Sequence, residues 1–407
     1  MKKFGLIGEK LSHSFSPKIH SLLGDYEYKL YEMPAENIES FLKHTDTAGL
    51  NVTIPYKKEV IKYCSGLSPT AQKLMSVNTL IKKPDGTFFG DNTDYYGFTY
   101  MISKSSIRIA GKKVLVLGDG GAAATVKAVV TDQNAGEMVV ISRKGENNYE
   151  NISRHYDGEI IINATSVGMY PNNGSSVIDI KDFPQCKCVF DLIYNPAKTK
   201  LILDAEELGI PSFNGLSMLV AQAKKSSELF TGISIDDHVI GKITDEISKR
   251  TKSIILIGMP GCGKTTIGAS LAKITGRVFI DIDAEIVKYA EKDIPDIFKN
   301  DGEEKFRAIE TEMLEKYTKL SGAVIAAGGG AVTKERNRDL IRQNSTVIFI
   351  ERDIGLLATK GRPLSYNRDL LILYNSRIKA YNEWSDHIVE NKTTDDTVEE
   401  IKELLAL

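Results

Sequence analysis

Residues 253–276, SIILIGMPGCGKTTIGASLAKITG, constrain the fold of this chain more than any other stretch. A β-branched run typical of a buried strand leads into a glycine-rich loop, and a helical pattern of apolar residues follows and ends at Gly276. The spacing G-x-x-x-x-G-K-[ST] is met by Gly258, Gly263, Lys264 and Thr265. Such a loop turns its backbone N–H groups toward phosphate oxygens at the start of a helix. The sequence therefore predicts an α/β domain that binds a nucleotide.

The chemistry expected at this loop is the binding of ATP with Mg²⁺. Lys264 would reach the outer phosphates, and the Thr265 hydroxyl would ligate Mg²⁺. The next strand pattern, RVFIDID, ends in Asp281 and Asp283, and period-2 spacing would place both carboxylates on one side of an extended strand. One of them can hold Mg²⁺ through water while the other orients a substrate hydroxyl. The predicted ATP-binding residues of the loop are Gly261, Cys262, Gly263, Lys264, Thr265 and Thr266.

A second nucleotide loop lies in KKVLVLGDGGAAATVKAVV, at residues 112–130. It again has the pattern of strand, turn and helix. The dinucleotide fingerprint G-x-G-x-x-A is met by Gly118, Gly120 and Ala123. A carboxylate that faced a pyrophosphate would repel it, so we expect Asp119, inside the turn, to point to solvent.

The strand pattern that follows this loop, EMVVISRK, indicates the type of dinucleotide. An NAD enzyme places an acidic residue there on the ribose hydroxyl, whereas this chain has Ser142, Arg143 and Lys144. Because cations suit a 2′-phosphate, the predicted cofactor is NADP(H). The residues expected to bind it here are Gly118, Gly120, Gly121, Ala122, Ser142, Arg143 and Lys144.

The number of domains follows from length and pattern. A chain of 407 residues holds two or three domains of about 100 to 200 residues each. Short β-branched runs alternate with helical stretches almost throughout, which predicts an α/β fold with mostly parallel sheets. A helical pattern ends in charged residues near Arg250, directly before the strand pattern at 253. We therefore expect one domain at 1–249 and another at 250–407.

The composition excludes several classes of partner. The net charge is −2, with Lys and Arg scattered among Asp and Glu, so we expect no nucleic acid to bind. No apolar run reaches the roughly 18 residues of a membrane span, and the N-terminus lacks the apolar core of a signal peptide. The four cysteines form no CxxC pair. These features predict a cytoplasmic protein with reduced thiols that acts on small molecules, and they leave its oligomeric state open.

Four further motifs in the second half of the chain indicate a resemblance to a known family. GEEKFRAIE, VIAAGGGAV, KGRPLS and NSRIKAYNEWSD follow the phosphate loop, and with it residues 250–407 resemble shikimate kinase over their whole length. The resemblance implies a P-loop kinase domain with a parallel sheet. It assigns Asp283 to the ring hydroxyls, close to the attacking oxygen, and Arg307 and Arg377 to the substrate carboxylate.

The resemblance also assigns the backbone of Gly328, Gly329 and Gly330 to the substrate ring, and Arg362 to the ATP phosphates as part of a closing lid. The lid departs from the family pattern, because Lys360 stands where some relatives have a further arginine.

The first half carries another set of motifs in order. LSHSFSPKIH, GLNVTIPYKKEV, SVNTLI, GDNTDYYGF, NATSVGM, DLIYNP and NGLSMLVAQA resemble those of shikimate dehydrogenase across residues 1 to about 247. The resemblance implies a substrate-binding α/β subdomain and an NADP-binding Rossmann subdomain. It makes Lys57 and Asp94 the catalytic pair and places Gly215 and Met218 near the nicotinamide. The residues it assigns to the ring of the substrate are Ser14, Ser16, Thr53, Asn78, Asp94, Tyr194 and Gln222.

The position of Lys57 suggests how it would act. It follows the strand pattern GLNVT and Pro55, so we expect it in the first turn of a helix. There the helix dipole disfavours the charged ammonium form and would help the group exchange a proton with a ring oxygen. A neighbouring carboxylate would offset this effect by stabilising the ammonium form. Reducing a ketone requires a proton for the oxygen, and a Lys/Asp pair supplies it without a metal.

Together the resemblances imply a bifunctional enzyme of aromatic amino-acid biosynthesis. Its first half would reduce 3-dehydroshikimate to shikimate with NADPH, and its second half would phosphorylate shikimate to shikimate 3-phosphate with MgATP. One alternative is a quinate/shikimate dehydrogenase of broader substrate choice fused to a small-molecule kinase. Another is a nucleotide-binding regulator with one inactive site.

Overall fold

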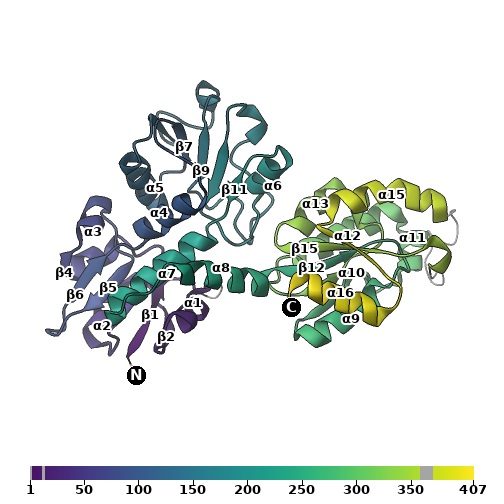
Figure 1. The fold of residues 1–407 in the computed structure, drawn as a ribbon, viewed down its shortest axis with the longest axis horizontal. Helices are drawn as coiled ribbons and strands as arrows, with labels where there is room; N and C mark the ends of the chain where they lie inside the picture. The colour runs from purple at the N-terminus through teal and green to yellow at the C-terminus, as the bar shows by residue number, and fades with distance from the viewer. Residues whose placement is uncertain (1, 12–13, 358–369) are drawn as a thin grey trace. The chain divides into compact units, whose positions relative to one another are not determined.

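The computed structural model describes residues 2–11, 14–357 and 370–407, and it divides into two compact units (Figure 1). Within these ranges, no helix is both long and apolar enough to cross a membrane. The first unit comprises Met1–Val167, Ser176–Tyr194 and Asp204–Ile247. The second comprises Gly168–Ser175, Asn195–Leu203 and Ser248–Leu407.

The first unit begins with a mixed six-stranded sheet in the order β2-β1-β3-β5-β6-β4. Its strands are β1 (Lys3–Gly8), β2 (Glu27–Glu32), β3 (Gly49–Val52), β4 (Cys64–Leu67), β5 (Thr79–Lys82) and β6 (Phe88–Asp91). Its helices are α1 (Ser16–Leu23), α2 (Ile38–His44) and α3 (Pro69–Leu74). β5 runs antiparallel to both β3 and β6, and a short turn containing Gly86, with φ +85°, joins β5 to β6 as a hairpin. The expectation of parallel sheets therefore holds only in part here.

The second sheet of this unit is five-stranded and parallel, in the order β11-β10-β9-β7-β8. Its strands are β7 (Lys113–Leu117), β8 (Glu137–Ile141), β9 (Ile160–Asn163), β10 (Cys188–Asp191) and β11 (Ser212–Phe213). The helices in this part of the chain are α4 (Asp94–Lys104), α5 (Gly121–Asp132), α6 (Lys200–Glu207), α7 (Leu216–Thr231) and α8 (His238–Thr251). The strand order reverses at β7, which has β8 on one side and β9 on the other. Open α/β sheets bind ligands at such a switch point, beyond the carboxyl ends of the strands.

The second unit contains a five-stranded parallel sheet in the order β13-β14-β12-β15-β16. Its strands are β12 (Ser253–Ile257), β13 (Phe279–Asp281), β14 (Val324–Ala326), β15 (Ser345–Glu351) and β16 (His387–Glu390). Its helices are α9 (Lys264–Thr275), α10 (Ile282–Ala290), α11 (Ile294–Asn300), α12 (Gly302–Tyr317), α13 (Glu335–Arg342), α15 (Leu370–Trp384) and α16 (Thr394–Leu405). All five residues of β12 are buried, as expected of a central parallel strand with both faces covered.

The second unit also holds the two short segments from earlier in the chain. The Tyr170 hydroxyl donates to the carbonyl oxygen of Thr318 over 3.1 Å, and Asn173 Nδ2 donates to Gln343 Oε1 over 2.6 Å. The boundary predicted between residues 249 and 250 lies in the last turn of α8.

Candidate active sites

The first candidate site is built around an ion pair between Lys57 and Asp94. Lys57 Nζ lies 2.6 Å from Asp94 Oδ2, and the two side chains are 23% and 14% exposed. Asp94 is the first residue of α4, and its backbone N–H donates to Asn92 Oδ1. The pair is therefore fixed in place and still open to solvent on one side, which suits exchange of a proton with a bound substrate.

The expectation that Lys57 lies in the first turn of an α-helix was wrong. Lys57 lies in a turn that precedes a short 3-10 helix, η2 (Glu59–Tyr63). The turn forms because the Tyr56 ring is buried and its hydroxyl bonds to the carbonyl oxygen of Met33, which ties the chain down beside Lys57. Lys57 therefore does not begin a helix of its own, and the charge of Asp94, at the N-terminus of α4, balances its ammonium group.

Hydrogen bonds link Asn78 and Gln222 to this pair. Asn78 Nδ2 donates to Asp94 Oδ1 over 2.9 Å, so each oxygen of Asp94 has its own partner. Thr93 Oγ1 lies within hydrogen-bonding distance of both Asn78 and Gln222. The structure thus brings two of the predicted polar residues, Asn78 and Gln222, and the catalytic pair into one connected group through Thr93.

The remaining predicted ring ligands of this half lie in neighbouring segments. Ser14 Oγ accepts from the backbone N–H of Ser16, at the start of α1. Thr53 directly follows β3, and its methyl group lies against the end of β1 at Gly8. The ring of Tyr194 lies 5.4 Å from that of Phe15, and burial raises the pKa of its hydroxyl.

The dinucleotide turn between β7 and α5 has room for a phosphate. Gly118 has φ +98°, and a Cβ there would meet the Thr165 methyl at 2.8 Å. A Cβ on Gly120 or Gly121 would meet no described atom within 4 Å apart from the adjacent backbone, so the N-terminus of α5 is open to a ligand. Asp119 is 55% exposed, as expected, and pairs with Lys127. Its charge is therefore partly neutralised beside the turn.

The cations predicted to bind a 2′-phosphate follow β8. Arg143 and Lys144 are exposed, and within the described part of the chain neither side chain forms an ion pair. Gly215 directly precedes α7, and a Cβ there would lie 2.1 Å from the Leu192 carbonyl oxygen. Only glycine fits at that position. An open helix N-terminus and two exposed cations together suit NADP(H).

The second candidate site begins at the phosphate loop between β12 and α9. Gly258, Gly261 and Gly263 all have positive φ, of +145°, +86° and +105°. Lys264 begins α9, and its Nζ donates to the carbonyl oxygens of Gly258 and Met259. Thr266 lies exposed in the first turn of the same helix.

The Thr265 hydroxyl donates to Asp281 Oδ2 over 2.6 Å. Mg²⁺ in such sites keeps several waters and takes one or two protein oxygens beside the phosphates, so this hydroxyl and carboxylate fit it. The prediction that Asp281 and Asp283 share a strand was wrong. β13 ends at Asp281, whose other oxygen caps α10 by accepting from the Ala284 N–H, and Asp283 lies in the first turn of that helix.

Charged side chains converge on the glycine triplet Gly328–Gly330. A Cβ on Gly328 would lie 2.3 Å from Glu310 Oε1 and 2.8 Å from Asp283 Oδ1. One on Gly330 would lie 2.2 Å from both terminal nitrogens of Arg307. One on Gly329 would overlap Pro260 of the phosphate loop. The triplet therefore joins the phosphate loop to the predicted substrate residues.

Two buried arginines lie at the triplet with unused hydrogen-bonding capacity. Arg377 Nη1 donates to the Gly329 carbonyl oxygen over 3.0 Å, and burial lowers the pKa of its guanidinium. Among the described residues, the Nε atoms of Arg307 and Arg377 have no hydrogen-bond partner. Two guanidinium groups with spare donors suit a planar carboxylate, the group that the resemblance to shikimate kinase assigns to them.

Sequence reasoning missed three residues here. Glu310 is fully buried and bonds to Arg307 Nη1 over 2.7 Å, and burial raises the pKa of its carboxyl. Its spacing of three residues from Arg307 on one helix was a usable signal. Tyr381 donates to the Gly329 carbonyl oxygen over 2.5 Å, and Asn391 Nδ2 donates to the Cys262 carbonyl oxygen over 2.6 Å. Nothing local marks these last two, because their partners are distant in sequence. Arg362 and Lys360 of the predicted lid lie outside the described residues.

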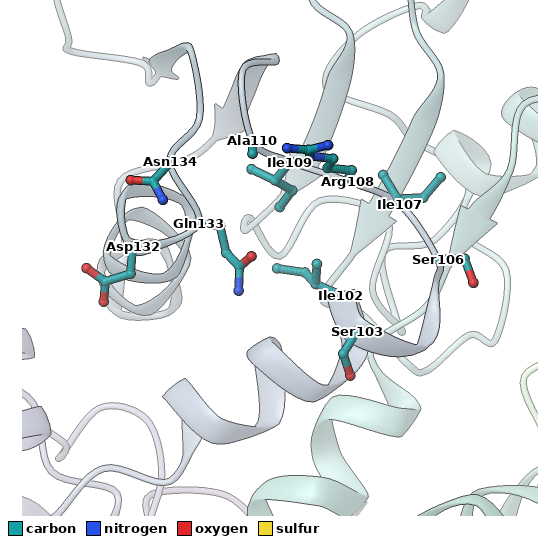
Figure 2. Close-up of a pocket in the computed structure, with 10 residues that line it drawn as sticks. All are labelled: Ile102, Ser103, Ser106, Ile107, Arg108, Ile109, Ala110, Asp132, Gln133 and Asn134. Atoms are coloured by element: carbon teal, nitrogen blue, oxygen red, sulfur yellow. The ribbon is translucent and has the colours of Figure 1, made fainter.

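A separate hollow of about 440 Å³ lies between the ends of α4 and α5 (Figure 2). Its lining combines apolar side chains such as Ile102 and Ile109 with exposed polar ones. It contains none of the predicted site residues, and its one carboxylate, Asp132, already bonds to Lys73 and Tyr95. The hollow is therefore not part of either candidate site.

Comparison with known proteins relates both halves of the chain to known families. The family model described as shikimate dehydrogenase substrate binding domain matches residues 6–80, and the model described as shikimate kinase matches residues 260–406. The NADP⁺-dependent shikimate dehydrogenase of Clostridium perfringens is 37% identical over 271 residues, which cover 61% of this chain and all of that protein. The shikimate dehydrogenase of Caldicellulosiruptor bescii is 34% identical and is covered over 96% of its length.

Solved structures show the similarity to shikimate dehydrogenases. A chorismate mutase/shikimate 5-dehydrogenase fusion protein from Clostridium acetobutylicum superposes with a TM-score of 0.59 at 38% identity, over 61% of this chain and 98% of that one. A shikimate dehydrogenase solved in complex with NADP⁺ gives a TM-score of 0.56 at 28% identity, over 60% of this chain and 95% of that one. The chain therefore belongs to the shikimate dehydrogenase family and carries, at residues 260–406, a shikimate kinase domain.

Proposed function

We propose that residues 1–249 reduce 3-dehydroshikimate to shikimate with NADPH, and that residues 250–407 transfer the γ-phosphoryl group of MgATP to the 3-hydroxyl of shikimate. The observation that carries the first activity is the 2.6 Å pair of Lys57 and Asp94 in a chain that also has an open dinucleotide turn. The second is supported by two buried arginines at a glycine triplet that packs on the phosphate loop. A regulator with an inactive site would not need both sets of residues intact.

In the reductase, bound NADPH supplies a hydride for the carbonyl carbon. The Lys57 ammonium group donates a proton to the carbonyl oxygen, so that a hydroxyl group forms, and solvent restores the proton to Lys57. Asp94 keeps the ammonium group in place and accepts a hydrogen bond from a ring hydroxyl. Ser14, Ser16, Thr53, Asn78, Tyr194 and Gln222 would bind and surround the rest of the ring.

In the kinase, ATP supplies the phosphoryl group. Asp283 orients the attacking hydroxyl, and Arg307 and Arg377 hold the ring carboxylate so that the hydroxyl faces the phosphate loop. Lys264 neutralises charge on the phosphates, while Thr265 and Asp281 hold Mg²⁺. Positioning and neutralisation of charge are the main demands of phosphoryl transfer, and these residues meet them.

The setting of the two reactions is also part of the proposal. The substrates are small molecules, and neither nucleic acid nor a membrane takes part. All four cysteines are free thiols, which supports a reducing compartment such as the cytoplasm.

The test is a coupled assay on the purified chain. 3-Dehydroshikimate and NADPH are mixed first and the loss of NADPH absorbance is followed; ATP and Mg²⁺ are then added and ADP is measured. We expect NADPH consumption at once and ADP only after shikimate has formed. NADPH consumption without ADP, even with added shikimate, would refute the kinase assignment, and no NADPH consumption would refute the reductase assignment.

A further inference from the structure

A group of buried polar side chains extends from the Asp94 carboxylate into the interior of the first unit. Each member is at most 5% exposed and carries a hydroxyl or amide group; the members are Asn51, Asn78, Thr79, Thr93 and Ser226. We call them the hydroxyl–amide cluster. They come from β3, β5, the loops before β5 and α4, and α7. Because buried polar groups are costly unless they are bonded, such a cluster fixes the elements that contribute to it.

Ser226 is the meeting point of this cluster. Its Oγ accepts from Asn51 Nδ2 over 2.8 Å and lies 3.0 Å from the hydroxyl oxygens of both Thr79 and Thr93. It also lies 2.9 Å from the carbonyl oxygen of Gln222, one turn earlier on α7. Figure 1 shows α7 beside α1 and α4, the helices on which it packs. Ser226 therefore joins the helix that carries a predicted ring ligand to the strands beneath the catalytic pair.

The cluster also determines which way the Asn78 amide faces. Asn78 Oδ1 accepts from Thr79 Oγ1 over 3.0 Å and from the Thr93 backbone N–H over 2.7 Å. With its oxygen bound to these donors, Asn78 presents Nδ2 to Asp94. A reversed amide would place its oxygen against the Asp94 carboxylate. Because both atoms are hydrogen-bond acceptors, they would repel each other. The orientation of Asp94 thus depends on hydroxyl groups that never touch it.

We propose that Ser226 is a positioning residue of the reductase, acting on the ring substrate through Gln222 and Asp94. This rests on the function proposed for residues 1–249. Ser226 holds the backbone of α7 at Gln222, and through Thr79 and Thr93 it supports the Asn78 amide that orients Asp94. Neither route involves the dinucleotide turn. Loss of the Ser226 hydroxyl therefore weakens the use of the ring substrate and leaves the binding of NADPH unchanged.

The experiment compares Ser226→Ala with Ser227→Ala. Ser227 is the next residue of α7, is equally buried, and its hydroxyl also has a partner, the Tyr26 hydroxyl at 2.9 Å. We expect Ser226→Ala to lower kcat/KM for 3-dehydroshikimate by about tenfold, the factor that corresponds to about 1.4 kcal/mol. The KM for NADPH and the rate of shikimate phosphorylation stay unchanged. Ser227→Ala leaves all three constants unchanged, although both variants lower the melting temperature.

A second variant keeps the test decisive if Ser226→Ala fails to fold. Thr79→Val preserves the shape of the side chain and removes one of the donors to Asn78, so we expect the same selective loss. Equal losses of kcat/KM in the two serine variants would overturn the inference, as would an unchanged value in Ser226→Ala. A wild-type chain that does not reduce 3-dehydroshikimate refutes the proposed function itself, whereas an active wild type with an insensitive Ser226→Ala refutes only the role of Ser226.

Discussion

Replacing Lys57 by alanine separates the two activities of this chain. The variant removes the ammonium group that lies 2.6 Å from Asp94. General acid–base catalysis contributes about 10²- to 10⁴-fold in rate, which corresponds to roughly 3 to 5 kcal/mol of activation free energy. We therefore expect the reductase kcat to fall by at least about 10²-fold, because no other described cation pairs with Asp94.

The structure predicts a smaller effect of Lys57→Ala on stability. The pair is part-buried, so the loss of one partner lies between the roughly 1 kcal/mol or less of an exposed pair and the roughly 3 to 5 kcal/mol of a fully buried one. Asp94 also keeps its hydrogen bond from Asn78. The free energy of unfolding should thus fall by about 1 to 3 kcal/mol, while the activation free energy rises by roughly 3 to 5 kcal/mol.

The assay follows NADPH absorbance with 3-dehydroshikimate and, in the same preparation, ADP release with added shikimate. The second rate should be unchanged, because it depends on residues 250–407. Lys58→Ala is the matched control, since Lys58 is the adjacent, exposed lysine and should leave both rates unchanged. An undiminished reduction rate in Lys57→Ala would remove Lys57 from the mechanism, and a parallel loss of both rates would point to misfolding.

Three further predictions test other parts of the chain. Arg143→Ala should lower kcat/KM with NADPH by about tenfold or more, the size of a lost charge-assisted hydrogen bond, while leaving NADH almost unaffected; equal losses with both would contradict a 2′-phosphate contact. Asn391→Ala should raise the KM for ATP several-fold by freeing the Cys262 carbonyl, with no change in reduction; an unchanged KM for ATP would refute this. The His20 imidazole is buried between Tyr26 and Tyr28, and burial lowers its pKa to about 3. Below about pH 6.5 the unfolded chain therefore binds a proton at His20, whereas the folded chain does not. Stability from His20 is thus present above that pH and should be lost at about 1.4 kcal/mol per pH unit on acidification, as urea unfolding of wild type and His20→Gln would show; identical pH slopes would contradict it.

The parts of the fold that depend on local chemistry could be predicted from the sequence. The stretch SIILIGMPGCGKTT predicts a strand, a phosphate loop and a helix, and β12 and α9 lie there. A run of β-branched residues predicts the strand, and glycines that can adopt positive φ predict the loop. Both signals lie within a few residues of each other. The alternation of strands and helices likewise predicts the α/β class of both units.

Features that depend on distant partners could not be predicted in this way. Lys57 lies in a turn and not in a helix because Tyr56 is anchored at Met33, far back in the chain. Asp283 lies in a helix because the preceding carboxylate caps it, whereas period-2 spacing suggested a longer strand. Ser226 reads as an ordinary polar residue of a helix, and its partners on β3 and β5 become visible only once the chain is folded.

The glycine triplet at 328–330 has a consequence for anyone who wishes to redirect the kinase to another polyol. At these positions the wall of the site is main chain, and an added carbon atom would displace Glu310, Asp283 or Arg307, or overlap Pro260. Libraries that randomise the triplet should therefore return inactive clones rather than altered preferences. Changes in acceptor choice must come from the side chains around it, with Asp283 for the hydroxyls and the two arginines for the acid group as the adjustable positions.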